Sequence, residues 1–166
     1  MSLKTSINKT KLPAGFKLVE EIPGYGCLLD YGCGKWTTHI KKYVEDLGYI
    51  YCPYDPNIKV NGIVTADDDG NVISVLPLNF LNYDCIMCCN VLNVILDNDE
   101  LEKTIRKIKR LSSRDTKVIF QIYEGPDGSG KPTKTQRNEK TDRYLRRVRK
   151  HFPKAVRKGR NYIIVK

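Results

Sequence analysis

Three short stretches of the sequence place glycine or polar residues directly after apolar runs. These stretches are Asp30-Tyr31-Gly32-Cys33-Gly34, then Asp55, then Asn90-Val91-Leu92-Asn93. If the apolar runs before them are parallel strands, the strands end at one edge of a sheet, where open α/β folds bind their ligands. The sequence therefore predicts one binding crevice built from all three stretches.

The first two stretches suit a ligand that carries a ribose. Gly32 and Gly34 permit a sharp turn and bring backbone N–H groups close to a ligand at a helix start. Asp55 lies 21 positions beyond Gly34, the spacing at which such folds use a carboxylate to bind a ribose diol. A structural interpretation stays open, because such turns often need glycine for steric reasons and Asp55 could form a turn before Pro56. The P-loop pattern is absent and the dinucleotide pattern GxGxxG is broken at Thr37, which disfavours ligands of those two classes.

The first half of the chain predicts strands that alternate with a helix. Thr37 or Thr38 can cap the helix and Gly48 can end it. Its apolar residues fall at helical spacing and are Ile40, Tyr43, Val44 and Leu47. Strands are expected at 49–52, which a pair of prolines should stop, and within 62–76, where one of two β-branched runs should be the third strand.

The second half continues the alternation. Residues 84–92 are apolar after the first one, as in a strand covered on both faces. Asp97 and Asp99 favour a helix start, and the inner stripe of that helix is Leu101, Ile105, Ile108 and Leu111. The remaining predictions are a strand at 118–123, a flexible loop at 124–134, a helix at about 135–151, a tight turn at 157–160 and a strand at 162–165.

This alternation predicts an α/β fold. We expect a Rossmann-like, mostly parallel sheet with helices on both faces and an antiparallel C-terminal edge strand. The length suits a single domain over 1–166, with an irregular lead-in over 1–25 that has room for one helical turn. Neither a membrane span nor a secretory signal is recognisable, so we expect a cytoplasmic protein without a membrane partner. The sequence does not indicate the oligomeric state.

Six cysteines raise the question of a metal site. Cys85 and Cys88 are the only pair spaced like a metal knuckle. Residues three apart on a strand point to opposite faces, so this pair could not share one ion. We therefore expect no metal and free, mostly buried thiols, which suits a reducing cytoplasm.

The net charge of +10 is concentrated at the C-terminal end. Residues 126–166 hold 14 Lys and Arg and 3 Asp and Glu, a net charge of +11, whereas residues 1–125 have a net charge of −1. Such a basic segment attracts polyanions, nucleic acid first, because phosphate contacts release condensed counterions. The same charges could instead form a solvated helix face that only aids solubility. Lys131, Lys134 and Arg137 are the nearest candidates for contact with an anionic substrate.

The sequences LLDYGCGKW, YCPYDP and YDCIMCCNVLNVI resemble motifs I, II and IV of class I S-adenosylmethionine-dependent methyltransferases, in the usual order and spacing. The chain from YEGPDGSGKP onward is similar to the tail of small methyltransferase-like proteins of bacteriophages and bacteria. The resemblance begins at about Cys27 and runs to the end. It implies S-adenosylmethionine as the cofactor, S-adenosylhomocysteine as its product, and methyl transfer as the activity.

The resemblance also implies a set of cofactor-binding residues: Asp30, Tyr31, Gly32, Cys33, Gly34, Asp55, Pro56, Asp67, Asn90 and Val91. Within this set, Asp30 would reach the methionine amino group and Asp55 would bind both ribose hydroxyls. Asp67 is the candidate near adenine, and Asn90 with Val91 would line the methionine side. No catalytic residue is implied, because alignment of an acceptor with the electrophilic methyl group often needs no general base.

Trp36 stands where the family usually has a third glycine. Its indole could stack on or crowd the cofactor, or it could pack against the helix start, and both interpretations stay open. The leading hypothesis is a methyltransferase that acts on nucleic acid or on a nucleic-acid-associated substrate. The alternatives are a non-catalytic cofactor-binding module and a nucleic-acid-binding protein with a vestigial methyltransferase fold.

Overall fold

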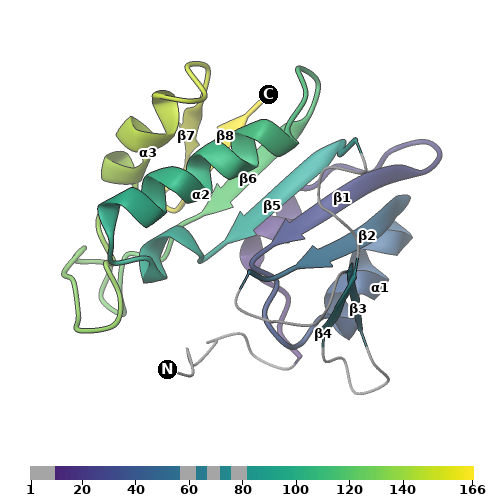
Figure 1. Ribbon diagram of the computed structural model, residues 1–166, viewed down its shortest axis with the longest axis horizontal. Coiled ribbons are helices and arrows are strands. Elements are labelled where there is room, and N and C mark those ends of the chain that lie inside the picture. The colour runs from purple at the N-terminus through teal and green to yellow at the C-terminus, as the bar shows by residue number, and fades with distance from the viewer. Residues whose placement is uncertain (1–9, 57–62, 67–71, 76–81) are drawn as a thin grey trace.

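The computed structural model describes residues 10–56, 63–66, 72–75 and 82–166. Its main sheet has six strands in the order β2-β1-β5-β6-β8-β7 (Figure 1). The strands are β1 Gly26–Tyr31, β2 Tyr49–Tyr54, β5 Cys85–Cys89, β6 Lys117–Gln121, β7 Val156–Lys158 and β8 Tyr162–Val165. The helices are η1 Ala14–Leu18, α1 Thr38–Asp46, η3 Leu92–Val94, α2 Asn98–Leu111 and α3 Thr141–Arg149.

The pairing of the strands confirms the predicted α/β class. Strands β2, β1, β5 and β6 are parallel to one another, and β8 runs antiparallel to β6. The antiparallel strand is not the edge of the sheet, however, because β7 pairs with its outer side. The sequence predicts a tight turn over 157–160, but the turn is shorter. Its Gly159 has a φ of 60°, and the preceding residues extend back along β8.

Strand β2 and the region that follows it differ from the expectation. β2 continues through Pro53 to Tyr54, and it can do so because β2 is an edge strand, where proline is tolerated. The expected third strand of the main sheet is instead a separate antiparallel hairpin of β3 Ile63–Ala66 and β4 Val72–Val75. Both β-branched runs are strands, and the short connection between them suits an antiparallel pair.

Helices cover both faces of the sheet, as predicted (Figure 1). On one face, the core combines Phe16 of η1 and Ile40 and Val44 of α1 with Leu28, Met87 and Ile119 of the sheet. On the other face, Leu101, Ile105 and Ile108 of α2 and Tyr144 and Val148 of α3 pack on Leu29, Ile86, Val118 and Phe120. The described part of the lead-in, residues 10–25, packs on the sheet, because its Phe16 is fully buried.

The cysteines follow the strand geometry expected of them. Cys85 belongs to the core on the α1 face and Cys88 to the core on the α2 face, so the two thiols do point to opposite sides of β5. All six thiols are free. Burial raises the pKa of Cys85 to about 12, which keeps this thiol protonated at neutral pH. Within the described ranges, no three His, Cys, Asp or Glu side chains are grouped so that they could hold a metal.

Helices α2 and α3 start for different reasons. The side chain of Asp97 accepts a hydrogen bond of 2.9 Å from the backbone N–H of Glu100, so α2 begins at the predicted place. α3 begins six residues later than the helix predicted from about 135, because the N–H of Arg137 is donated to Asn93 O at 2.7 Å. Asn138 then has a φ of 46°, which is incompatible with a helix. In the part of the chain that the structure describes, no helix has both the length and the apolar composition needed to cross a membrane.

Candidate functional site

Hydrogen bonds join the glycine turn after β1 to the end of β2. The N–H groups of Gly32 and Cys33 both donate to Tyr54 O, at 2.6 and 3.1 Å. The next glycine N–H, that of Gly34, donates to Asp55 Oδ2 at 3.0 Å. The first two predicted stretches therefore meet at the carboxyl edge of the sheet, with the carboxylate of Asp55 buried between them.

The third stretch packs directly on this turn. Gly32 has a φ of 81°, and a Cβ at this position would lie 2.3 Å from Val91 Cγ2. A side chain at Gly32 is therefore excluded twice, by backbone conformation and by the contact with Val91. This packing shows why the turn carries glycine, a reason that the sequence analysis could not separate from ligand binding.

Asp30 is the most buried acid at the site, with 2% of its surface exposed. Tyr51 donates a hydrogen bond of 2.6 Å from its hydroxyl to Asp30 Oδ2. Burial raises the pKa of Asp30, the hydrogen bond from Tyr51 lowers it and the neighbouring charge of Asp55 raises it, and the net pKa is about 7. The protonation of Asp30 thus changes close to neutral pH.

The loop after β5 places polar atoms at the same edge. Asn90 has a φ of 57°, and its N–H donates to Gln121 O at 2.8 Å. Asparagine tolerates this left-handed conformation better than most residues. Its side-chain Oδ1 is buried and has no hydrogen-bond partner among the described residues. An acceptor is therefore held next to Val91, on the side predicted for the methionine moiety.

A hollow of about 480 Å³ opens beside the turn, on the face covered by α2. Tyr31, Pro56 and Val91 line it, so three predicted cofactor residues share one surface. Its other wall is formed by residues 94–97 and by Glu100, Lys103, Thr104 and Lys107 of α2. Sequence reasoning missed this wall, because no local pattern reports that a helix lies against the ends of two strands.

Aromatic and cationic groups meet at one side of this hollow. The rings of Tyr31 and Tyr54 are 5.2 Å apart. Lys107 Nζ donates to Tyr54 Oη at 2.7 Å and lies 4.8 Å from the centre of the same ring. These contacts fix the side chains that face the hollow, and they tie α2 to the end of β2.

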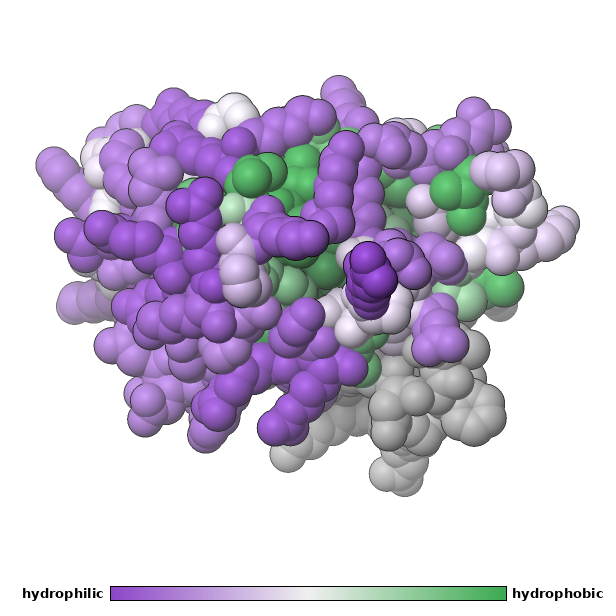
Figure 2. Space-filling view, turned by 90° about the horizontal axis from the view of Figure 1, so that it is seen from above, coloured by the Kyte–Doolittle hydropathy of each residue, from purple (hydrophilic) through white to green (hydrophobic). Residues whose placement is uncertain are grey.

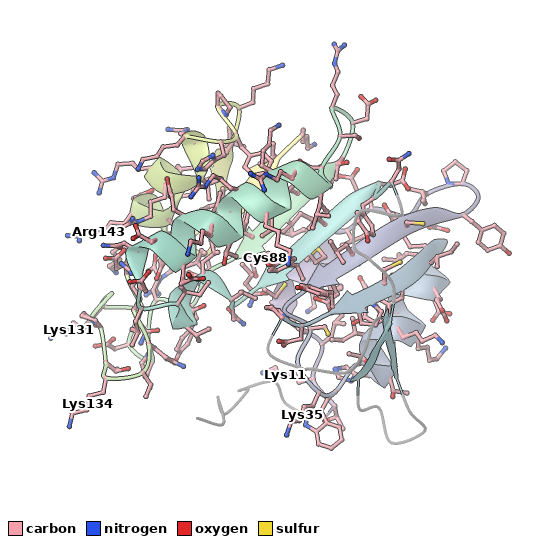
Figure 3. All side chains as sticks on the ribbon, in the orientation of Figure 1. Lys11, Lys35, Cys88, Lys131, Lys134 and Arg143 are labelled. Carbon is pink, nitrogen blue, oxygen red and sulfur yellow. The ribbon has the colours of Figure 1, made fainter. Side chains whose placement is uncertain are left out.

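The predicted substrate residues are not brought together. Lys131 and Lys134 are exposed and, like Arg143, point away from the body of the molecule (Figure 3). Arg137 is buried, and its guanidinium donates to Ile95 O at 3.0 Å and to Leu96 O. Arg137 therefore connects the segment before α3 to the loop after β5, and its role differs from that of the two lysines.

Asp67, the candidate near adenine, lies outside the described residues. Trp36 is half-buried just before α1, and the choice between contact with the cofactor and packing at the helix start stays a prediction.

Comparison with solved structures identifies the fold. A TehB-like S-adenosylmethionine-dependent methyltransferase from Corynebacterium glutamicum aligns with a TM-score of 0.53 at 15% identity, over 87% of this chain and 80% of that one. An S-adenosylmethionine-dependent methyltransferase from Clostridium acetobutylicum aligns with a TM-score of 0.50 at 13% identity, over 83% and 81%. The mitomycin 7-O-methyltransferase MmcR aligns with a TM-score of 0.51 at 12% identity, over 84% of this chain and 48% of that one. The chain thus has the Rossmann-like fold of these methyltransferases.

A family profile described as a methyltransferase domain matches residues 9–158, which is nearly the whole chain. The chain belongs to this methyltransferase family. The resemblance inferred from the three motifs is confirmed, whereas the closer likeness to bacteriophage proteins stays a prediction. No match was found among curated protein sequences.

The packing of Gly32 on Val91 predicts the effect of a single methyl group. Gly32→Ala should lower the free energy of unfolding by about 1–2 kcal/mol because alanine disfavours the left-handed backbone conformation. Overpacking against Val91 should lower it by roughly a further 1–3 kcal/mol. Gly24→Ala is the matched control, because Gly24 has a φ of 89° and open space around its Cβ position. Urea denaturation would measure both variants. Equal losses in the two variants would contradict the proposed contact.

The burial of Asp30 predicts a pH-dependent stability. Because its pKa is higher in the folded protein than in the unfolded chain, the folded state holds the proton more tightly. Stability should therefore fall as the pH rises from about 4 to about 7, by at most about 1.4 kcal/mol per pH unit, and then level off. Asp30→Asn should flatten this profile in urea denaturation, whereas Asp46→Asn, which changes an exposed carboxyl on α1, should leave it unchanged. Parallel profiles for wild type and Asp30→Asn would refute the assignment.

Proposed function

We propose that this chain binds S-adenosylmethionine at the carboxyl edge of β1, β2 and β5 and is a methyltransferase that releases S-adenosylhomocysteine. The observation that carries this proposal is the buried carboxylate of Asp55, bonded to Gly34 N–H where the three motif stretches meet. When bound, the cofactor supplies an electrophilic sulfonium methyl group.

The residues present fit such a cofactor. Asp55 offers carboxylate oxygens suited to a ribose diol, because each hydroxyl can donate to a charged acceptor. Asp30 is a buried acid next to the turn, and a nearby ammonium group favours the ionised form of an acid. The unpartnered Oδ1 of Asn90 is a further acceptor at this edge.

The task of the protein residues is mainly to position the acceptor and to keep water out. The glycine turn is fixed by three hydrogen bonds and by Val91, so its backbone does not have to reorganise when a ligand binds. The aromatic ring of Tyr31 and the apolar side chains of Val91 and Leu96 line part of the adjoining hollow. Orientation of this kind is sufficient for methyl transfer in many cases, and no general base has to be assigned.

Removal of the Asp55 carboxylate tests the cofactor site. Asp55→Ala should weaken S-adenosylhomocysteine binding by about 1.5–3 kcal/mol, because hydrogen bonds to a charged acceptor are lost. Asp46→Ala removes an exposed carboxylate on α1 and should leave the affinity unchanged. Isothermal titration calorimetry would measure both. An unchanged affinity in Asp55→Ala would show that the ribose lies elsewhere.

We also propose nucleic acid, or a substrate associated with it, as the methyl acceptor. Hydrophilic side chains cover the side of the molecule on which α3 lies (Figure 2). Several of the cations in the basic segment are already paired, as in Arg157 with Asp142 at 2.7 Å and Lys150 with Glu102 at 3.4 Å. The exposed Lys131 and Lys134 are therefore the better candidates for contact with phosphate.

The phosphate contacts predict a dependence on salt. Charge reversal of Lys131 and Lys134 to Glu should weaken the binding of single-stranded RNA or DNA and reduce the slope of log affinity against log salt by about 0.7 for each lost contact. Reversal of Lys41 and Lys42 on α1 is the matched control and should change neither quantity. A labelled-methyl assay on the same nucleic acids would test turnover.

The outcomes separate the proposed function from its alternatives. Methyl transfer to nucleic acid supports the full proposal. Tight cofactor binding without turnover on any acceptor would favour a non-catalytic module. Nucleic-acid binding without cofactor binding would favour a vestigial methyltransferase fold.

A further inference from the structure

Buried polar atoms without hydrogen-bond partners are concentrated in one region of the molecule. Nine such side-chain atoms occur among the described residues, and six of them belong to Asn90, Asn93, Asn138, Glu139 and Asn161. Buried polar groups are nearly always paired in folded proteins, so a cluster of exceptions indicates a ligand site or bound water. None of these residues except Asn90 has a role in the site described above.

Backbone contacts show that the loops carrying these residues converge. Arg137 N–H donates to Asn93 O at 2.7 Å, which joins the loop after β5 to the segment before α3. Ile122 N–H donates to Asn161 O at 2.8 Å, which brings the turn between β7 and β8 to the end of β6. The side chain of Asn138 lies against Gly125, within 4 Å of the position where a Cβ would stand. The cluster thus adjoins the carboxyl ends of β5 and β6.

Asn138 is the central member of the cluster. It is fully buried, and neither Nδ2 nor Oδ1 of its carboxamide has a hydrogen-bond partner among the described residues. Its φ of 46° holds the side chain in a conformation that few residue types accept. A buried amide in this state disfavours the folded protein unless a partner satisfies it on binding.

The charges beside this amide are already compensated. Glu124 is buried and accepts hydrogen bonds from Thr141 N–H at 2.8 Å and from Lys140 Nζ and Arg160 Nε, each at 3.4 Å. Glu139 lies 3.6 Å from Arg137 and 3.7 Å from Arg143. Apart from Glu139 Oε2, the unpartnered groups of the cluster are neutral amides, which select an uncharged polar group.

We propose that Asn138, together with Asn93, binds the group that is to be methylated, and that this group is a nucleobase. The proposal rests on the function proposed above, since the cluster lies next to Asn90 at the cofactor edge. A carboxamide presents a donor beside an acceptor, and this pair matches the edge of a base. The exposed Lys131 and Lys134 on the same loop favour a base that carries phosphate over an amide of a protein side chain.

Entry of a base requires the cluster to open. The segment from Gly125 to Gly130 begins beside Asn138, at Gly125, and contains three glycines with positive φ, at 94°, 61° and 74°. Lys140 Nζ donates to Gly128 O, and Gly130 N–H donates to Glu124 O at 3.0 Å, so few bonds hold this segment in place. We therefore assign it as the part that moves when the base reaches Asn138.

Titration of ¹⁵N-labelled protein with AMP, CMP, GMP and UMP tests the subsite. We expect at least one nucleotide to shift the side-chain amide signal of Asn138, and we expect Asn138→Gly to bind that nucleotide at least tenfold more weakly. Glycine accepts the left-handed conformation at 138, so this variant keeps the fold. Asn98→Ala, at the exposed start of α2, is the matched control and should bind like wild type.

A parallel titration with S-adenosylhomocysteine separates this inference from the proposed function. Asn138→Gly should bind S-adenosylhomocysteine like wild type. If S-adenosylhomocysteine does not bind but nucleotide binding still depends on Asn138, the proposed function fails and the base subsite stands. Equal nucleotide affinity in wild type and Asn138→Gly, no nucleotide binding by wild type, or a preference for free glutamine over all four nucleotides would overturn the subsite.

Discussion

The hydrogen bonds that Tyr54 O and Asp55 accept from the turn after β1 are the constraint on which the site depends. They fix three consecutive N–H groups against the end of a neighbouring parallel strand, so the turn cannot relax independently of β2. Val91, in the loop after β5, then packs against this turn, in a space that is open only because residue 32 is glycine. Strand order, turn conformation and the buried carboxylate are therefore one structural unit. Because its backbone is already fixed, little conformational entropy is lost there when a ligand binds.

Buried polar groups at the carboxyl edge of the sheet destabilise the fold, and they indicate that a ligand binds there. Asp30 is held in an environment that raises its pKa to about 7, which disfavours the charged form in the folded state. Six unpartnered atoms lie on the loops at the ends of β5, β6 and β8. By contrast, the two faces of the sheet are covered by apolar side chains. The helices and the sheet supply stability, and the loops at the carboxyl edge retain unsatisfied groups where binding can satisfy them.

The basic C-terminal segment serves the structure as well as the surface. The carboxylate of Glu124 receives the first N–H of α3 and the side chains of Lys140 and Arg160, so one buried acid orders the helix start and the turn after β7. Arg137 connects the same segment to the loop after β5. The net charge of the sequence therefore overstates the number of cations that are available to bind a polyanion. Lys131 and Lys134 belong to the exposed part of the segment, on the loop before α3.

The sequence by itself determined the features that depend on neighbouring residues. Helix α2 follows from its apolar stripe and the cap at Asp97, the opposed thiols of Cys85 and Cys88 follow from strand periodicity, and the glycine turn with Asp55 follows from spacing. Features that depend on which segments pair with one another were decided only by the tertiary structure. α3 is shorter than its pattern because Asn93 takes the N–H of Arg137, β7 forms because β8 offers an edge, and the β-branched runs after β2 pair with each other. Local patterns cannot report these outcomes, since the energy of each comes from contacts between segments, either distant ones, as for Arg137 and Asn93, or the two strands of a hairpin, as for β7 with β8 and β3 with β4. The unpartnered amide of Asn138 is of the same kind, because burial is a property of the folded chain and not of the residue.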